Sequence, residues 1–126
     1  MKSAYNDSQA FVTRDGSLIR ELMHPDVHGK KGYGVNRQSL AEATIPTGVS
    51  TKLHKHHQTE ELYFILDGQG LMTLADDQFE VGPGDTICIP PETPHCIENT
   101  GTNELKILCC CSPAYSHEDT ELLDQK

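Results

Sequence analysis

The sequence predicts an all-β fold, a small antiparallel β-barrel or jelly roll (double-stranded β-helix) to which a short C-terminal helix can be added. Three observations favour this class. Short apolar or alternating segments recur along the chain, turn residues separate them at regular intervals, and no convincing long helix is present. The length of 126 residues and the 36% hydrophobic content suit a single globular domain, so we expect one domain over residues 1–126.

The first third of the chain predicts an arm and a loop. Residues 1–9 are polar and are expected to fray, whereas residues 10–13 and 17–22 predict two strands around the turn Arg14-Asp15-Gly16. Residues 24–34 contain one proline and three glycines, which predicts a long loop at the edge of a pocket.

Residues 37–45 predict the next strand. Ser39, Ala41 and Ala43 share one face of it, because alternate residues of a strand point to the same side. These small side chains either leave room for a cavity or pack in the ordinary way, and the sequence leaves both interpretations open.

The rest of the chain predicts hairpins. Glycine, proline and aspartate turns at 46–48, 68–70, 76–77 and 82–85 separate short apolar or alternating segments, and residues 112–126 form a C-terminal tail. Within this tail, Ser116 can cap a short helix that has acidic residues in its first turn. The predicted strands are 54–56, 61–66, 71–74, 78–81, 87–89 and 105–111.

Four residues of the central region have the pattern of a metal site. His54 and His56 are two apart on a predicted strand, so both imidazoles point to one face. Glu61 begins the following strand, and His95 follows a proline-rich stretch that holds its backbone extended. Imidazole nitrogen and carboxylate oxygen together suit a divalent ion such as Zn, Fe, Mn, Ni or Cu. A single histidine in a strand is more often packed or solvated, but four residues in register favour a shared ion.

Histidine and cysteine residues outside this set predict no second site. His57 has the opposite parity to His56, so we expect it to point toward solvent. The chain has five cysteines, and Cys109, Cys110 and Cys111 are consecutive residues that alternate between faces and cannot all pair locally. We therefore expect reduced thiols that pack as small buried residues.

With these residues the sequence resembles the cupin superfamily. The first cupin motif places a glycine, a His-x-His pair, a glutamate and a second glycine at fixed spacings. Gly48, His54, His56, Glu61 and Gly68 match every one of these positions.

The second cupin motif is matched with one departure. Gly84, Pro90, His95 and Asn99 stand at the motif positions, but Glu92 stands where the motif has a glycine. Because a side chain disfavours a positive φ, we expect the loop before His95 to take a different turn.

The resemblance implies a jelly-roll fold and a metal ion on His54, His56, Glu61 and His95, but it does not select a reaction. Cupins include isomerases, dioxygenases, decarboxylases and lyases, and also non-enzymatic binding and sensing domains. We expect a metal-dependent enzyme that acts on a small polar molecule, with a non-enzymatic metal-containing binding or sensing module as the alternative. Tyr63 shares the parity of Glu61 and is the candidate for proton transfer, although core packing also explains it.

Charge and composition restrict the partners. Nineteen acidic and ten basic residues give a net charge of −9, which disfavours nucleic acid and anionic membranes. No segment approaches a membrane span and the N-terminus is polar, so a cytoplasmic location is expected. The exposed sheet edges of a small barrel, together with the resemblance, predict a homodimer that binds a small-molecule ligand.

Overall fold

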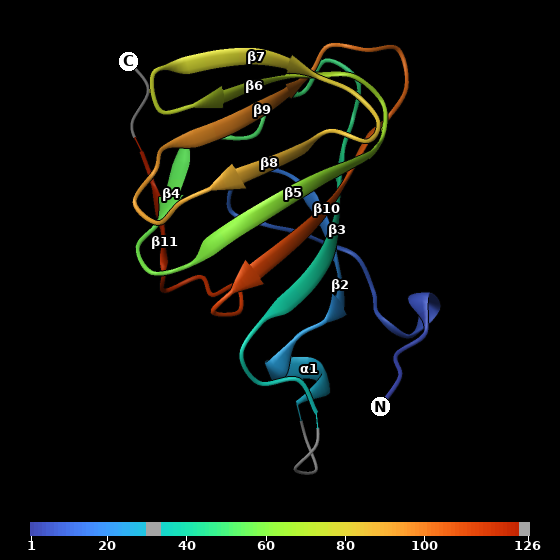
Figure 1. Ribbon diagram of the computed structural model, residues 1–126. Coiled ribbons are helices and arrows are strands. Elements are labelled where there is room, and N and C mark those ends of the chain that lie inside the picture. The colour runs from blue at the N-terminus through green and yellow to red at the C-terminus, as the bar shows by residue number, and fades with distance from the viewer. Residues whose placement is uncertain (30–33, 124–126) are drawn as a thin grey trace.

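The computed structural model describes residues 1–29 and 34–123 and consists almost entirely of β-strands (Figure 1). Two short helices interrupt them, a 3-10 turn η1 at Tyr5–Asp7 and α1 at Pro25–His28. The strands are β1 (Phe11–Val12), β2 (Leu18–Met23), β3 (Ser39–Ile45), β4 (His54–His56), β5 (Glu60–Asp67), β6 (Gly70–Leu74), β7 (Asp77–Val81), β8 (Thr86–Ile89), β9 (His95–Asn99), β10 (Leu105–Ser112) and β11 (Thr120–Leu122).

The strands form two antiparallel sheets. One has the order β1-β2-β3-β10-β5-β8 and the other the order β11-β4-β9-β6-β7. The eight strands from β3 to β10 contribute four to each sheet, and the chain repeatedly crosses from one sheet to the other, as in a jelly roll. The predicted all-β class and antiparallel pairing are confirmed.

The hydrophobic core lies between the inner faces of the two sheets. Burial alternates along β5 and β10, where every second side chain points inward. Full burial of such an apolar side chain contributes about 1.5–3 kcal/mol. The largest apolar side chains below 2% exposure are Ile45, Ile65, Met72, Ile89, Ile97, Leu105 and Ile107.

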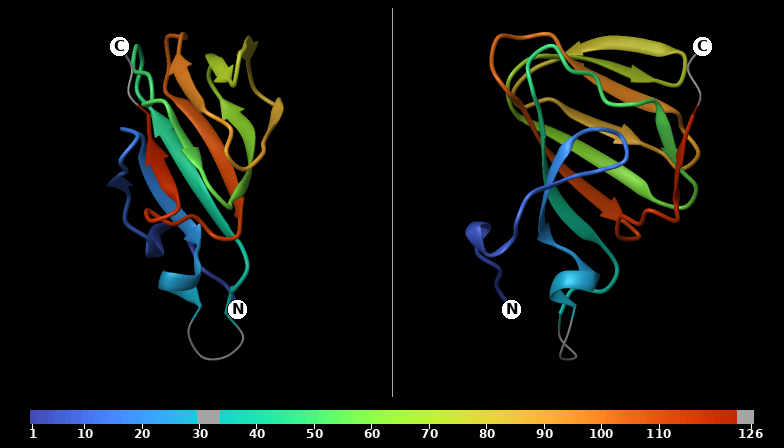
Figure 2. Two further views of the ribbon diagram at one scale, coloured as in Figure 1. Left: turned by 90° about the vertical axis from the view of Figure 1, so that its left-hand side faces the viewer. Right: turned by 180° about the vertical axis from the view of Figure 1, so that it is seen from behind.

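The N-terminal arm extends the first sheet and then contacts the second. The strands predicted at residues 10–13 and 17–22 are present as β1 and β2, and β2 pairs with β3. Figure 2 shows this arm, in blue, lying across the molecule in the view from behind. The turn between β1 and β2 accepts a hydrogen bond from Lys52 N to Asp15 O at 2.8 Å, just before β4. The arm therefore brings its turn close to His54.

The predicted loop at residues 24–34 contains a helical turn. Pro25 begins α1, and the His24 side chain accepts a hydrogen bond from Asp26 N. A proline at the first helical position has the φ that a helix needs, and a side-chain acceptor before it satisfies a free backbone donor. These local signals produce a helical turn where the glycine and proline content predicts only a loop. Residues 30–33 of this stretch lie outside the described residues.

The predicted C-terminal helix is wrong. Ser116 does cap the backbone N–H of Glu118, but the chain then turns and Thr120–Leu122 forms β11. This strand pairs antiparallel with β4, with Thr120 opposite His56 and Leu122 opposite His54. Pairing with the free edge of β4 outweighs the local helix signal, because it satisfies backbone groups along the whole segment.

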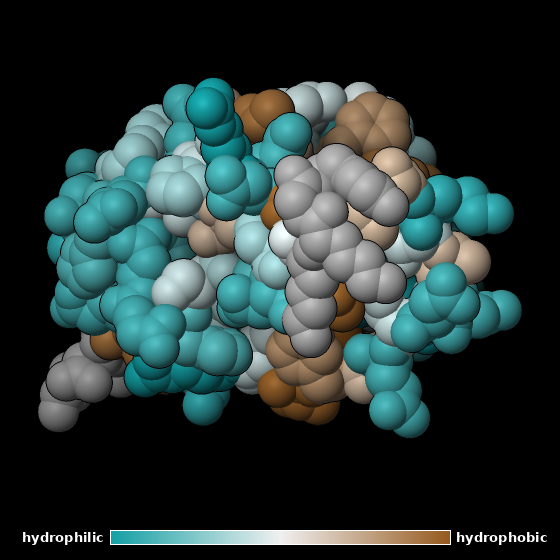
Figure 3. Space-filling model, turned by 90° about the horizontal axis from the view of Figure 1, so that it is seen from below, coloured by the Kyte–Doolittle hydropathy of each residue, from teal (hydrophilic) through white to brown (hydrophobic). Residues whose placement is uncertain are grey.

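The molecular surface is largely hydrophilic at the end that carries α1. Figure 3 shows this end from below, with teal hydrophilic residues over much of the surface and smaller brown hydrophobic areas between them. Among the described residues, no helix has the length and apolar character needed to cross a membrane.

Candidate metal centre

The structure brings the four predicted ligands together in the interior. His54 and His56 come from β4, His95 from β9 and Glu61 from β5 of the opposite sheet. His54 pairs directly with His95 across the β4–β9 ladder. All four residues are at most 5% exposed. The alternation of β4 places both of its imidazoles on the inner face, as the His-x-His spacing predicts.

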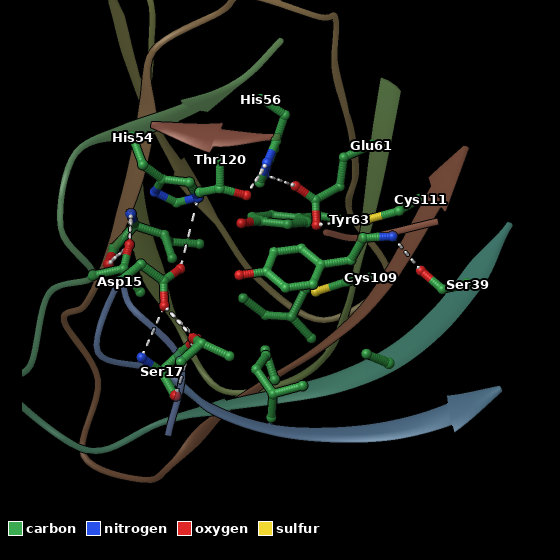
Figure 4. Close-up of a pocket in the computed structure, with 18 of the residues that line it drawn as sticks. Asp15, Ser17, Ser39, His54, His56, Glu61, Tyr63, Cys109, Cys111 and Thr120 are labelled. Carbon is green, nitrogen blue, oxygen red and sulfur yellow. Dashed lines mark hydrogen bonds and ion pairs between the residues drawn. The ribbon is translucent and has the colours of Figure 1, made fainter. Parts of the chain in front are cut away.

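The side-chain atoms lie at distances that suit ligands of one ion. One ring nitrogen from each of His54, His56 and His95 lies within 4.8 Å of the others. Glu61 Oε1 lies 3.3 Å from His56 Nε2 and 3.7 Å from His95 Nε2. Figure 4 shows the labelled His54, His56 and Glu61 side chains pointing toward a common space.

The other ring nitrogen of each histidine is held by an oxygen. His54 Nδ1 donates to Lys52 O at 2.7 Å, and His95 Nδ1 donates to Thr93 O at 2.9 Å. His56 Nδ1 lies 2.9 Å from Thr120 Oγ1, whose own hydrogen is donated to Ser116 O. The threonine oxygen therefore accepts from His56. In its neutral form each imidazole carries its proton on Nδ1, and this leaves the Nε2 lone pair free to bind a cation.

Glu61 is oriented by a thiol. Cys111 Sγ donates to Glu61 Oε2 at 3.4 Å, and this leaves Oε1 facing the histidines. Burial and the neighbouring Glu61 carboxylate raise the pKa of Cys111, so its thiol stays protonated and acts as a donor.

A cation fits this arrangement on the geometry of the residues themselves. Glu61 Oε1 and His95 Nε2 are fully buried and have no hydrogen-bond partner among the described residues. The carboxylate oxygen is an acceptor, and so is Nε2 of a neutral His95 ring whose proton lies on Nδ1. Two acceptors that face one another in the interior are unfavourable unless a cation lies between them. Burial, followed by the nearby His95, lowers the pKa of His54 to about 4, so its imidazole is neutral at pH 7 as a metal ligand must be.

The loop before His95 corrects one expectation. Glu92 adopts φ 64°, the left-handed conformation for which the motif glycine is suited. The different turn that we expected is therefore not formed, and the glutamate takes the backbone conformation of a glycine. Its exposed carboxylate contacts Lys55 Nζ at 3.2 Å and His57 Nδ1 at 3.0 Å. His57 is exposed, as its parity predicts.

A cavity of about 50 Å³, measured as the space open to the centre of a water-sized sphere, is lined by His54, His56 and Glu61 of the four. Ser39, Ala41 and Ala43 line it, so the cavity interpretation of these small residues is correct. Tyr63 lines it as well, and burial followed by the Glu61 charge raises the pKa of its hydroxyl, which stays protonated.

A second carboxylate lines the same cavity. Glu21 lies on β2 and is paired across the sheet with Ala41 on β3. Ala41 is paired with Cys109 on β10, and Cys109 with Tyr63 on β5, so all four residues lie in one row across the sheet. Glu21 Oε1 is buried and accepts no hydrogen bond from a described residue. Burial raises the pKa of Glu21, nearby His24 lowers it, and Asp26 raises it further, with a net increase.

Sequence reasoning missed several residues near the site. The sequence predicts only a turn for Asp15, only packing for Cys111, and a short helix after Ser116 where Thr120 begins a strand. In the structure, Asp15 Oδ2 lies 3.7 Å from His54 Nε2. Glu21 had a local signal, because a glutamate at the parity of Ser17 and Ile19 places a charge on an otherwise inward face. No comparable local signal exists for the other three.

Comparison with known proteins agrees with this architecture. The family model for the cupin domain matches residues 41–111. The uncharacterized protein MJ1618 of Methanocaldococcus jannaschii is 56% identical over 124 residues, which cover 98% of this chain and 95% of that protein. The oxalate-binding protein of Thermotoga maritima is 35% identical over 95 residues, covering 75% of this chain and 77% of the relative. The polyketide cyclase RemF of Streptomyces resistomycificus superposes with a TM-score of 0.79 at 22% identity, covering 100% of this chain and 87% of the cyclase.

Proposed function

This chain belongs to the cupin domain family, and from that premise we propose that it is a metal-dependent enzyme that acts on a small polar molecule. One divalent ion would be held by His54, His56, Glu61 and His95. The observation that carries the proposal is the convergence of three Nε2 lone pairs and one carboxylate oxygen. Each side chain is oriented by a hydrogen bond to its other polar atom, which is Nδ1 in the histidines and Oε2 in Glu61.

The donor set restricts the chemistry without selecting one reaction. Three imidazoles and one carboxylate suit Zn, Fe, Mn, Ni or Cu, and four protein ligands leave positions for a substrate on a six-coordinate ion. When bound, such an ion polarises a carbonyl, activates water, or supports oxygen chemistry if it is iron. Reactions of the isomerase, lyase and dioxygenase type are all compatible with this site.

Tyr63 is the proposed proton-transfer group. Its ring packs in the core, edge-on to His95 at 6.2 Å between ring centroids, while its side chain also lines the cavity. Because its hydroxyl stays protonated, it is suited to donate a hydrogen bond or a proton to a substrate oxygen beside the ion.

Glu21 supports a substrate with polar groups at both ends. A ligand oxygen would bind at the histidine end, and a hydroxyl or amine would donate to Glu21 Oε1, which no described residue satisfies. Between them the cavity wall is formed by small or apolar side chains, including Ile19, Ala41 and Ala43. This pattern favours a short hydroxy acid, amino acid or sugar derivative.

The alternative is a metal-containing binding module without catalysis. The similarity to a protein named for oxalate binding favours this alternative, because that relative covers three quarters of the chain. A ligand with two carboxylates would bind the same ion without needing Tyr63.

We also propose that the chain functions as a single domain in the cytoplasm and does not bind nucleic acid or membranes. The net charge of −9 supports a small-molecule partner, and five unpaired cysteines suit a reducing compartment.

The test is calorimetric titration of metal-loaded and metal-stripped protein with oxalate, short hydroxy acids and sugar phosphates. We expect at least one compound to bind to the metal-loaded protein and not to the metal-stripped protein. We also expect the loaded protein to convert that compound to a product. Binding without conversion would favour the binding module. Equal binding to both forms would contradict a metal-dependent site.

A further inference from the structure

We propose that Asp15, in the turn between β1 and β2, is an additional protein ligand of the ion. This inference rests on the proposed metal site and extends it, because the aspartate comes from the N-terminal arm rather than from a strand that carries the cupin motifs.

The distance places the Asp15 carboxylate at the site. Its Oδ2 lies 3.7 Å from His54 Nε2, the nitrogen that faces the cavity. Ligand atoms bonded to one ion at about 2.0–2.2 Å lie roughly 3.0–4.4 Å apart, depending on the angle between them. The same separation of 3.7 Å joins Glu61 Oε1 to His95 Nε2. Figure 4 shows Asp15 beside His54, across the space from Glu61.

The contact between Asp15 and His54 is not a hydrogen bond. His54 already donates through Nδ1 to Lys52 O, which leaves Nε2 as an acceptor in the neutral ring. A separation of 3.7 Å is also too long for an N–H···O bond. Two acceptors therefore face each other over a distance that a bridging cation suits.

The carboxylate is fixed on its other side. Asp15 Oδ1 accepts from Thr13 Oγ1 at 2.7 Å, from Ser17 N at 3.0 Å and from Ser17 Oγ at 2.7 Å. Oδ2 accepts no hydrogen bond from a described residue, and the side chain is only 16% exposed. The hydrogen bonds that stabilise the turn all use Oδ1, so the turn does not require Oδ2. The free oxygen is held toward His54 and available to a cation.

Two functional consequences follow. Five protein ligands leave one position on a six-coordinate ion, so a substrate would bind through a single atom or displace the aspartate. The ion would also tie the N-terminal arm to β4, in addition to the bond from Lys52 N to Asp15 O. The arm thereby becomes part of the site.

The test replaces Asp15 by Asn and titrates the stripped protein with Mn²⁺. Asn keeps an Oδ1 acceptor for Thr13 and Ser17 but presents a neutral amide nitrogen in place of Oδ2. We expect the Mn²⁺ affinity to fall about 10-fold or more. We also expect water proton relaxation to report one more coordinated water than in the wild type.

Two control variants separate a ligand from a turn residue. Asp85→Asn changes another turn aspartate, which accepts from Gly82 N at 2.8 Å and is exposed, and it should match the wild type. Ser17→Ala removes one donor to Oδ1 but keeps the carboxylate, so its water count should stay unchanged. An added water in Ser17→Ala would instead attribute the effect to the turn and overturn the proposal.

The remaining outcomes are also decisive. An unchanged affinity and water count in Asp15→Asn would remove Asp15 from the site and leave the four-ligand proposal intact. A weaker affinity without an added water would show that the aspartate acts only through its charge, and this would overturn its role as a ligand. If the wild type bound no Mn²⁺, Zn²⁺ or Fe²⁺, the proposed metal site would fail together with this inference.

Discussion

At each of the three histidines, the oxygen that accepts from Nδ1 determines that Nε2 is the nitrogen available to the proposed ion. For His54 and His95 this oxygen is a backbone carbonyl two residues earlier in the chain, so the local strand geometry supplies it. For His56 it is the side chain of Thr120, which lies 64 residues away on β11. The tautomer of His56 therefore depends on one hydroxyl, and this makes it the most easily disturbed of the three.

Replacing Thr120 by Val tests this dependence. The two side chains have nearly the same shape, but valine cannot accept the His56 Nδ1 proton. We expect the metal affinity to fall about 10-fold, as for other residues that orient a ligand. Thr44→Val is the matched control, because Thr44 is a buried strand threonine away from the cavity lining. Equal affinities of wild type and Thr120→Val, measured by competition with a chelator, would contradict the prediction.

The raised pKa of the buried Glu21 predicts that this residue lowers the free energy of unfolding at neutral pH. Its pKa is raised in the folded protein, so the folded state binds more protons than the unfolded chain above the usual carboxyl pKa of 4.5. Stability attributable to this group is therefore present at low pH and is lost as the pH rises through the raised pKa. Glu21→Gln removes the titration.

The measurement is urea unfolding of both metal-free proteins at pH 4 and pH 7. We expect Glu21→Gln to gain stability relative to the wild type at pH 7 and to gain less at pH 4. The same difference at both pH values would show that burial does not penalise this carboxylate.

At the scale of elements, the loop between β8 and β9 positions His95, and one residue of this loop, Glu92, has an uncommon backbone conformation. Glu92 occupies the left-handed region at φ 64°, where glycine costs nothing and branched side chains are strained. Its contacts with Lys55 and His57 are exposed, so they offset this strain only slightly.

Substitutions at residue 92 test the strain. We expect Glu92→Gly to unfold at the same temperature as the wild type or higher, and Glu92→Val to unfold lower, in thermal scans followed by circular dichroism. Glu121→Val is the control, because Glu121 also contacts His57, at 3.3 Å, but lies on the extended strand β11. A melting temperature for Glu92→Val no lower than that of Glu121→Val would refute the strain argument.

The contributions of single elements also explain what could be predicted from sequence. Strand alternation alone predicts that His54 and His56 point inward and that His57 points outward. This alternation depends only on neighbouring residues in the sequence. Thr120 and Asp15 could not be found in this way, because their positions depend on β11 pairing with β4 and on the arm folding across to Lys52. The same long-range pairing explains why the predicted helix at the C-terminal end is a strand.

For the whole molecule, the proposed homodimer has a candidate face on the outer side of the larger sheet. Leu62, Phe64 and Leu66 point outward from β5 and are 44%, 41% and 39% exposed. On β10, Leu108 and Cys110 lie opposite Phe64 and Leu62 and continue this apolar strip. Adjacent exposed apolar side chains are a common feature of surfaces that a partner covers, and a second copy of this chain would bury them by two-fold symmetry.

Light scattering of purified protein tests this face. We expect the wild type to have twice the mass of one chain, and Phe64→Lys to have the mass of one chain because a charge is not tolerated in an apolar interface. Phe79→Lys is the control, since Phe79 is 36% exposed but lies on β7 of the other sheet. A monomeric wild type, or dimers that persist in Phe64→Lys, would contradict this interface.

The central claim is that His54, His56, Glu61 and His95 hold one divalent ion. The most direct measurement is elemental analysis of protein purified without added metal, together with calorimetric titration of the stripped protein. We predict one ion per chain in the wild type and its loss in the His54→Ala, His56→Ala double variant, with folding checked by circular dichroism. Full metal content in a folded double variant, or no ion bound by the wild type at any concentration tested, would contradict it.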